Sequence, residues 1–511
     1  MDIFAFSIYF VAMIVIGIFF FVKSKVATEK DYFLGGRAMG PWVTAMSAQA
    51  SDMSAWLLMG LPGSILAFGF GQAWIGIGLA IGTAANWILV AKRLRKFSKA
   101  SNDAITLPQY LSNRFASKSH TVSIICAVVF LVCFTIYVAS AFVAGADVFT
   151  TLVPSLSRTT AMLIFAAIVV VYTFLGGFNA VCWTDFFQGL LMICALLIVP
   201  IVIAFTKNLD TAALSTVYTG PNGEEFEFVA NFFNASWKDI VSGLGWGLGY
   251  FGMPHIIVRF MAIEKPSMVK KSATVAIIWV VLSLAATIVI AYLGRMFVYS
   301  DGRDLSLELL ANGKQSLIFV ELARDVFPAF IAGLLLAAII AASMSTADSQ
   351  LLVAASSFSS DLYKPLIRKN ATNKEMLWVS RAVVLVIAVV AYFIASSKGK
   401  AAQAIMDLVS NAWGIFGAAF GPAVLLSLFW KRFTYKGAVA GIIAGAVIDM
   451  AWLWAPVADG ATLTSVTGIY EIIPGFIIGG IIAVIVTLID KAPSKEVEAI
   501  FEKATDNSID D

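Results

Sequence analysis

Charged side chains are scarce in this sequence. Asp, Glu, Lys and Arg make up only 13% of its 511 residues, roughly half the share of an average soluble domain. Hydrophobic residues make up 60%, which excludes a soluble protein with a single core. Because a helix that crosses the bilayer uses ~20 mostly apolar residues, this composition predicts an all-α polytopic membrane protein embedded in the lipid bilayer.

Residues that carry enzymatic or metal chemistry are also few. We interpret the four cysteines, which show no CxxC spacing, as packing residues buried in apolar stretches: Cys126, Cys133, Cys182 and Cys194. The two histidines cannot form a zinc protease motif, and no phosphate loop for ATP (GxxxxGK followed by Ser or Thr) occurs. A formal charge of +3 does not indicate nucleic acid as a partner. Since no nucleophile is paired with a base, we predict no catalytic residues and no enzyme.

Apolar windows bounded by charge predict thirteen membrane spans. Their approximate ranges are 3–22, 41–67, 71–91, 121–150, 159–178, 183–206, 231–259, 273–298, 328–357, 377–397, 403–430, 437–456 and 469–489. The basic residues Lys23 and Lys25 follow the first span rather than precede it. We therefore expect this span to be kept as a helix and not removed as a secretory signal.

The distribution of positive charge predicts the orientation in the plasma (inner) membrane. With the N-terminus outside and the C-terminus in the cytoplasm, 26 Lys and Arg residues fall on the cytoplasmic side and 9 on the other. This count places Arg259 and Arg381 at the cytoplasmic boundary of their spans. The asymmetry is that of the positive-inside rule, and a miscounted span would destroy it.

Two of the predicted spans contain helix breakers. In the second span, Gly60-Leu61-Pro62-Gly63 follows the polar stretch 47–54, and in the seventh, six glycines and prolines lie between 243 and 254. Broken helices leave backbone groups unpaired, which is tolerated in a membrane where they line a cavity or bind a ligand. A matched pair in the two halves of a chain predicts a transporter site between inverted repeats. Alternatively, the glycines simply allow close helix packing.

The breaks suggest how the chain is organised. We expect one transmembrane transporter domain over 1–511, with a peripheral first helix at 3–22. The repeats would occupy 41–206 and 231–430, followed by two helices within 437–489 and a cytoplasmic tail at 490–511. Too few residues follow Lys491 for a signalling domain, so we expect a transporter rather than a membrane sensor.

Two polar segments inside spans carry the chemistry. Asp52 lies within the second span, where an ionised carboxylate costs ~3 kcal/mol or more unless it is paired or hydrated. In the ninth span, helical spacing places Ser345, Asp348 and Ser349 on one face. Oxygen ligands of low total charge favour a hard monovalent cation such as sodium over transition metals. Hydrogen bonding to neighbouring backbone would explain the hydroxyls without a cation, but not Asp348.

These residues lie in strings that resemble the sodium/solute symporter family, most closely its bacterial sodium/proline symporters. The resemblance runs essentially end to end. Its landmarks are Leu34-Gly35-Gly36-Arg37, Ser51-Asp52-Met53-Ser54, Trp56-Leu57-Leu58-Met59-Gly60-Leu61-Pro62-Gly63, Gly176-Gly177-Phe178, Trp246-Gly247-Leu248-Gly249-Tyr250-Phe251-Gly252, Met344-Ser345-Thr346 and Tyr470-Glu471-Ile472-Ile473-Pro474-Gly475-Phe476.

The resemblance implies a LeuT-type fold and secondary active uptake of L-proline with a co-transported sodium ion. It implies a sodium site made by residues of the second and ninth spans: the carbonyls of Ala50, Met53 and Ala342, the hydroxyls of Ser345 and Thr346, and Asp52. It implies a proline pocket between the second, fourth and seventh spans, made by Ser54, Tyr137, Trp246, Tyr250 and Pro254. A broken helix with aromatic faces suits a small zwitterion that has an apolar ring.

Three positions depart from the proline symporters that the chain resembles. Gln49 and Ala55 stand where glycine is usual, and Met253 stands where glutamine is usual. Another small solute carried by the same mechanism is therefore the alternative substrate. We also expect a second cation position between Asp185, Asp348 and Ser349, because two carboxylates in a low-dielectric region repel unless a cation or proton lies between them. The alternative is that Asp348 hydrogen-bonds to its neighbours and binds nothing.

Overall fold

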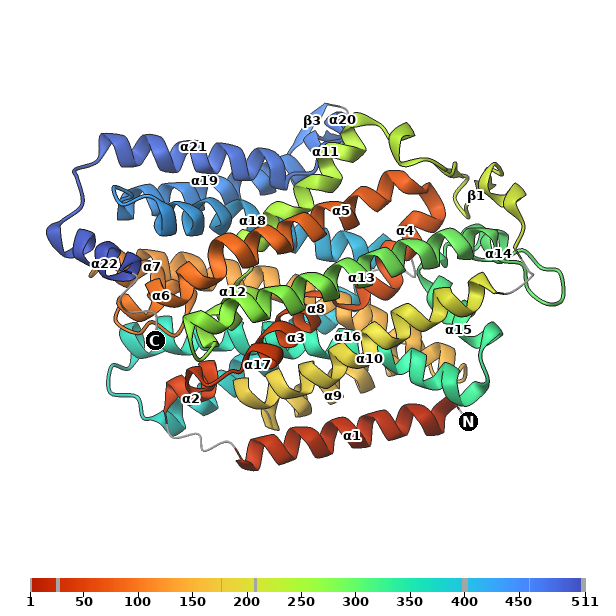
Figure 1. Cartoon of the computed structure of the whole chain (residues 1–511), viewed down its shortest axis with the longest axis horizontal. Helices are drawn as coiled ribbons and strands as arrows, with labels where there is room; N and C mark the ends of the chain where they lie inside the picture. Colours follow the sequence, from red (N-terminus) through yellow and green to blue (C-terminus); the bar gives the residue numbers. More distant parts are fainter. Residues whose placement is uncertain are drawn as a thin grey trace.

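The computed structural model describes residues 2–23, 28–175, 177–205, 209–397, 403–458 and 460–506. Gly176, one of the landmark residues, lies outside this set, as do the last residue of the first predicted repeat and residues 507–511 of the predicted tail. Figure 1 shows a bundle of long helices that run in roughly the same direction, with α1 along one edge and α19 and α21 along the opposite edge.

Within the described residues, ten helical segments are long and apolar enough to cross a membrane. They are α1 (Asp2–Lys23), α5 (Phe70–Ala85) continued by η3 (Asn86–Ala91) and α6 (Lys92–Ala100), α8 (Thr121–Leu152), α10 (Phe178–Ala204), η7 (Pro266–Met268) continued by α13 (Val269–Met296), α16 (Ala329–Ser356) continued by η9 (Ser357–Ile367), α17 (Asn373–Ser397), α18 (Gln403–Phe429), α19 (Tyr435–Trp454) and α21 (Ile472–Ile489). A shorter apolar helix, α9 (Arg158–Leu175), packs against α8 and α17. Large apolar side chains such as Ile14, Phe393 and Ile481 are exposed on these helices, as expected of surfaces that face lipid.

The second and seventh predicted spans are the interrupted ones. The second comprises α3 (Pro41–Asp52), the π-helical η2 (Trp56–Gly60) and α4 (Leu61–Phe68). The seventh comprises α11 (Trp237–Gly245), the 3-10 helix η6 (Trp246–Phe251) and α12 (Pro254–Ala262). The prediction of two broken spans is therefore confirmed.

The position of the first break corrects the prediction from Gly60-Leu61-Pro62-Gly63. Those residues are helical, and Pro62 lies in the first turn of α4, where a missing N–H costs little. The chain instead leaves the helix at Met53, whose ψ of 74° is not helical, and at Ser54. The break thus directly follows Asp52.

Glycines in the seventh span serve close packing as well as the break. A Cβ on Gly247 would lie 2.4 Å from the carbonyl oxygen of Gly78 on α5, and one on Gly249 would lie 2.0 Å from Nε1 of Trp413 on α18. The close-packing alternative therefore holds for these two glycines. The break itself lies at Gly252 and Met253, before Pro254 starts α12.

The remaining elements connect the long helices at the ends of the bundle. The short helices are α2 (Glu29–Leu34), η1 (Gly35–Arg37), α7 (Leu107–Arg114), η4 (Thr211–Leu214), η5 (Phe232–Asn234), α14 (Leu305–Ala311), η8 (Gln315–Leu317), α15 (Ile318–Val326), α20 (Leu463–Thr467) and α22 (Lys495–Thr505). Two antiparallel pairs of short strands complete the described residues: β1 (Tyr218–Thr219) with β2 (Glu225–Phe226), and β3 (Pro456–Ala458) with β4 (Ala461–Thr462). Hydroxyls of Thr106 and Ser494 cap α7 and α22, which explains where these two helices begin.

The cysteine prediction needs one correction. Three of the four cysteines are buried, but Cys194 is exposed on α10. Leu190 and Ile198 are exposed on the same helix. A helix surface that faces lipid is apolar without being covered by protein, so an apolar sequence context did not require Cys194 to be buried.

Candidate functional site

The two helix breaks meet through one hydrogen bond. The hydroxyl of Tyr250 on η6 donates to Oδ2 of Asp52, the last residue of α3, at 2.6 Å. Asp52 is 1% exposed, and its other carboxylate oxygen is buried without a hydrogen-bond partner among the described residues. The sequence predicted both residues but assigned them to different sites, and the structure brings them into direct contact.

Oxygen atoms gather where α16 crosses the end of α3. The hydroxyl of Ser345 donates to the carbonyl oxygen of Ala50 at 2.8 Å and to that of Ala342 at 3.2 Å. The hydroxyl oxygen of Thr346 is buried without a partner in the described part of the chain. Met53 follows Asp52 at the point where α3 ends. This group of hydroxyl and carbonyl oxygens, with one carboxylate nearby, is a donor set that hard cations prefer.

Aromatic side chains from three parts of the chain surround the second break. Trp246 stacks on Tyr470, with ring centroids 5.1 Å apart, and on Trp413, at 6.5 Å. Nε1 of Trp413 donates to the carbonyl oxygen of Trp246 at 2.8 Å, and the Trp413 ring meets Tyr250 edge to face. Trp413 was not predicted as a site residue, although a tryptophan in mid-span must find an acceptor for its N–H, and that need was the signal available.

A hollow of about 360 Å³ adjoins this aromatic cluster. Trp246 and Tyr470 line it together with the carboxylate residues Asp239, Asp407 and Glu471. None of the described residues that line it is a lysine or an arginine. A polar, acidic hollow that ends on an aromatic wall is accessible to small polar cations and zwitterions and repels anions.

The other predicted pocket residues lie around the first break. Tyr137 of α8 is 1% exposed and lies close to Ser54, Trp56 and Asp52, and its hydroxyl has no described partner in good hydrogen-bonding geometry. Pro254 is buried at the start of α12, next to His255, whose ring lies 6.4 Å from that of Tyr137. Ser54, Tyr137, Tyr250 and Asp52 are thus brought together between α3, α8 and η6.

A second buried polar cluster lies beside the next turn of α16, at Asp348 and Ser349. Oδ2 of Asp185 accepts from Ser47 at 2.7 Å and from Nη2 of Arg259 at 3.2 Å, and the same nitrogen donates to the hydroxyl of Ser349 at 2.5 Å. Asp348 is fully buried beside Ser349 and within electrostatic reach of Asp185 and Arg259, and neither of its carboxylate oxygens has a described partner in good hydrogen-bonding geometry.

Arg259, which charge counting places at the cytoplasmic boundary of the seventh span, has a buried side chain. Only 1% of it is exposed, and it turns into the bundle. Its guanidinium also donates to the carbonyl oxygen of His255, one helical turn earlier. The positive group against Asp185 is therefore a side chain of the protein itself. The cluster holds two carboxylates and one guanidinium, which leaves an excess of one negative charge if both carboxylates are ionised.

Gln49, Ala55 and Met253 are the three residues that differ from the symporters that the chain resembles. All three are buried close to the breaks. Oε1 of Gln49 accepts from Nε1 of Trp87 at 3.4 Å, so this side chain is directed toward η3. Ala55 directly follows the first break and is 1% exposed. Met253 forms the second break, and its carbonyl oxygen accepts from the N–H groups of Ile256 and Ile257.

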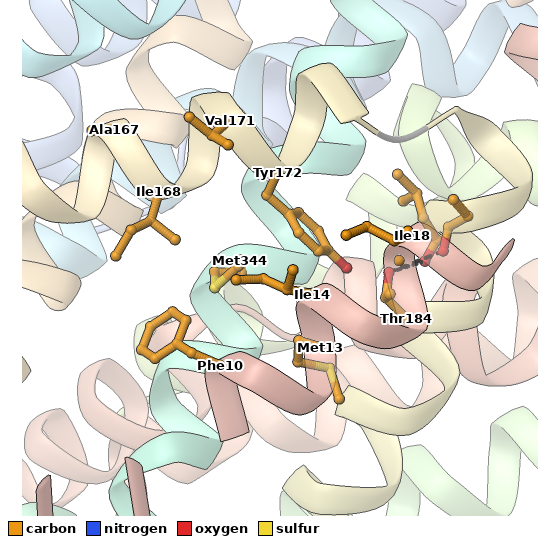
Figure 2. A pocket seen from close by; sticks show the side chains of 13 residues that line it. Phe10, Met13, Ile14, Ile18, Ala167, Ile168, Val171, Tyr172, Thr184 and Met344 are labelled. Carbon is orange, nitrogen blue, oxygen red and sulfur yellow. Dashed lines mark hydrogen bonds between the residues drawn. The ribbon is translucent and has the colours of Figure 1, made fainter. Parts of the chain in front are cut away.

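A further hollow, of about 320 Å³, lies between α1, α9, α10 and α16 and has a different character (Figure 2). Apolar side chains such as Phe10, Met13 and Ile168 surround it, and Met344 of α16 reaches it from the side of the bundle. Among the described residues of its lining, Tyr172 and Thr184 alone bring hydroxyls, and Thr184 donates to a backbone carbonyl of its own helix. This apolar lining does not suit a zwitterion.

A helical membrane bundle in which two interrupted helices meet beside a buried group of oxygen ligands defines the class of secondary transporters. The sequence pattern of the family described as "Sodium:solute symporter family" matches residues 32–445. The chain belongs to the sodium:solute symporter family.

Similar proteins cover nearly the whole chain. A sodium/proline symporter from Escherichia coli is 42% identical over 507 residues, which are 98% of this chain and 95% of that protein. One from Haemophilus influenzae is 42% identical over 500 residues, covering 98% and 96%. A high-affinity proline transporter from Bacillus subtilis is 40% identical over 494 residues, covering 97% and 99%.

Solved structures share the fold. A Na+-coupled sialic acid symporter in a substrate-bound outward-open state superposes with a TM-score of 0.74 at 20% identity, covering 97% of this chain and 99% of that one. A nucleobase-cation-symport-1 family transporter in a closed conformation gives a TM-score of 0.54 at 13% identity, covering 92% and 97%. The chain is thus a helical polytopic membrane protein with the fold of sodium-coupled symporters, and its family and relatives are transporters rather than enzymes.

Proposed function

We propose that this protein carries L-proline into the cell together with sodium, by alternating access, across the plasma membrane. Relatives named as proline symporters, at 40–42% identity over nearly the whole chain, support both the substrate and the coupling ion. The observation that carries the mechanism is the hydrogen bond between Tyr250 and Asp52, because it joins the two helix breaks. A cation bound at one break and a solute bound at the other then affect each other's affinity.

Sodium is proposed to bind where α16 crosses the end of α3. Its ligands would be the carbonyl oxygens of Ala50, Met53 and Ala342 and the hydroxyls of Ser345 and Thr346. The contact of Ser345 with two of these carbonyls and the unpartnered hydroxyl of Thr346 support this set. Asp52 would supply negative potential beside them without being neutralised by a salt bridge, since among the described residues the side chain that hydrogen-bonds to its carboxylate is the neutral Tyr250.

Proline is proposed to bind between the breaks. Trp246 and Tyr250 would provide the walls for its ring, and Ser54 and Tyr137 would provide hydroxyls for its charged groups. Pro254 would bound the site on the side of α12. The acidic hollow that ends on Trp246 and Tyr470 would be the route by which solute and sodium arrive.

We further propose thirteen membrane spans with the N-terminus outside and the C-terminus in the cytoplasm. Ten apolar helical segments, the shorter α9 and the two interrupted segments support this count. The excess of Lys and Arg on one side supports the orientation. The inverted repeats would then be 41–206 and 231–430, with one break in the first helix of each and 437–489 outside the repeats.

We also propose a second cation position between Asp185, Asp348 and Ser349. Arg259 already neutralises Asp185, so the group that needs a cation or a proton is Asp348. A coupled second sodium would give more than one sodium per solute in a flux-ratio measurement, falling to one in Asp348→Asn. Equal ratios in parent and variant would contradict a coupled ion there.

The experiment that tests the proposed function is uptake of labelled amino acids by the purified protein in proteoliposomes. We expect proline uptake in sodium buffer and only background uptake in choline buffer. Equal uptake in both buffers would contradict sodium coupling. Sodium-dependent uptake of another small solute in preference to proline would support the alternative substrate, which Ala55 and Met253 favour because they alter the space and the polar groups at the breaks.

A further inference from the structure

A basic pocket lies away from the two breaks, at one end of the bundle. It has a volume of about 340 Å³ and lies between α6, the connection from α12 to α13, and the C-terminal helix α22. Five cationic residues and one acidic residue line it together with Ala100 and Pro266: Arg95, Lys96, Lys99, Lys265, Lys503 and Glu264. The excess of positive charge is large for so small a volume.

Hydrogen bonds and an aromatic contact hold the three walls of this pocket together. The guanidinium of Arg95, which is 6% exposed, donates to the carbonyl oxygens of Ile263 and Glu264 at 2.6 and 2.8 Å. Phe97 of α6 meets Phe501 of α22 edge to face, with ring centroids 5.2 Å apart. These contacts fix the three walls relative to one another, so the pocket is a feature of the packed protein and not a gap between loose side chains.

Three lysines at the rim lie outside the ion pairs of the described residues. Lys99, Lys265 and Lys503 are exposed, and none of them forms an ion pair within the described residues. Three unpaired ammonium groups around one cavity repel each other, and an anion that enters between them removes that repulsion. Lysine ammonium groups and the arginine guanidinium are the usual partners of phosphate oxygens.

We propose that this pocket binds the phosphate group of an anionic ligand. Two sources offer that chemistry: the headgroup of an anionic phospholipid and a free phosphate ester. The position of the pocket brings both within reach, because α6 and α22 lie at one end of the bundle and α13 enters the apolar region from Pro266 (Figure 1). Basic pockets at the level of the headgroups are typical sites for anionic lipids. This inference does not depend on which solute the protein carries.

A bound phosphate would connect α6 and α22 to the segment that leaves α12. That helix begins at the second break and ends next to the carbonyls that Arg95 holds. We therefore expect the ligand to stabilise the folded protein, since anything that binds only the native state does so.

The test uses the full-length, delipidated protein in detergent and follows its thermal unfolding with three probes. These are a short-chain phosphatidylglycerol, a short-chain phosphatidylcholine and glycerol phosphate. The variant Lys99→Gln/Lys265→Gln removes two exposed charges of the pocket. The variant Lys369→Gln/Lys374→Gln removes two exposed lysines that do not line it and serves as the matched control.

We expect phosphatidylglycerol to stabilise the parent and the control variant, and to bind the pocket variant roughly tenfold or more weakly. Stabilisation by glycerol phosphate at the same concentrations, with the same loss in the pocket variant, would also support the site and would identify a free phosphate ester as its ligand. Equal binding by the parent and the pocket variant would overturn the proposal, and so would equal stabilisation by phosphatidylcholine and phosphatidylglycerol.

Discussion

Asp52 and Tyr250 form the contact through which a cation and a solute would be coupled. Their hydrogen bond is buried, and one carboxylate oxygen remains available for a cation or for its hydration. A hydrogen bond to a charged group contributes about 1.5–3 kcal/mol, more than one between neutral groups. Because the carboxylate lies beside the proposed sodium ligands and the phenol ring beside the proposed solute, a change at either residue should affect both ligands.

The first prediction concerns this pair. Tyr250→Phe removes only the hydroxyl, and we expect it to lower the apparent sodium affinity of proline uptake roughly tenfold or more. Asp52→Asn should weaken sodium dependence further, with a smaller effect on which solutes compete. In the double variant the two losses should not add, because they remove the same interaction.

Uptake rates measured against sodium concentration in proteoliposomes check this prediction. Tyr392→Phe on α17 is the matched control, because it also deletes one phenol hydroxyl. An unchanged sodium dependence in Tyr250→Phe, or strictly additive losses in the double variant, would show that Tyr250 and Asp52 act separately.

The second prediction concerns the hydroxyls of α16. Ser345→Ala removes a proposed sodium ligand, so the sodium concentration for half-maximal uptake should rise severalfold or more. Ser343→Ala is its control, since Ser343 lies on the same helix and donates to the carbonyl oxygen of Ile339 in the preceding turn. If both variants shift the sodium dependence equally, the effect belongs to the helix and not to a ligand.

Sequence patterns predicted site residues whose chemistry is unusual for their location. A carboxylate in an apolar span, as at Asp52, or a run of hydroxyls, as at Ser345 and Thr346, needs a partner wherever the helix lies. The same reasoning could not predict Arg259, because its position at the end of a span suggested water, while its long side chain folds back to a buried carboxylate. Trp413 comes from a helix far away in the sequence, and only packing brings it to Trp246.

At the scale of elements, the interrupted α11, η6 and α12 segment combines two requirements. It must approach α5 and α18 closely, and its helical hydrogen bonding must be interrupted near Met253. The glycine-rich sequence indicated a break but did not separate these two needs. In α3 to α4 the apparent breakers are helical, and the polar residues before them form the break. Proline in the first turn of a helix marks a start as readily as an interruption, so sequence alone could not locate this break.

The third prediction tests the packing requirement. Gly249→Ala would place a Cβ 2.0 Å from Nε1 of Trp413, which the rigid indole cannot accommodate without displacement. Overpacking of this kind typically costs about 1–3 kcal/mol or more. We expect a lower midpoint of thermal unfolding and strongly reduced proline uptake.

Gly40→Ala is the control for this substitution. Gly40 precedes α3 with a φ of −71°, and nothing lies within 4 Å of its added Cβ. Its unfolding midpoint and uptake should match those of the parent. A Gly249→Ala variant with the stability and uptake of the parent would contradict the close packing of η6 on α18.

At the scale of the whole molecule, acidic and basic side chains line two separate hollows of the described residues. The hollow that ends on Trp246 is lined by carboxylates, and the pocket between α6 and α22 at the end of the bundle is lined by lysines and arginine. Overall composition predicted a helical membrane fold, because burial in lipid leaves so few alternatives for the backbone. Pockets arise from the packing of distant segments, and no pattern in the sequence located them.

Sodium-coupled uptake of proline draws energy from the membrane potential and from the sodium gradient. One sodium ion that moves inward gains ~2.3 kcal/mol per 100 mV of membrane potential, enough for roughly fifty-fold accumulation of a neutral solute. An inward sodium gradient adds to this driving force even when the potential is zero. The membrane potential and the sodium gradient drive proline uptake only if sodium and proline cross the membrane in the same transport cycle.

The most direct test of this account starts from proline at equal concentration on both sides of proteoliposomes, with the membrane potential clamped at zero. A tenfold inward sodium gradient is then the only driving force. The account predicts net proline accumulation, up to roughly tenfold for one sodium per proline, that collapses when a sodium ionophore is added. If internal proline stays at its starting concentration while the sodium gradient persists, the central claim of sodium-coupled proline transport is wrong.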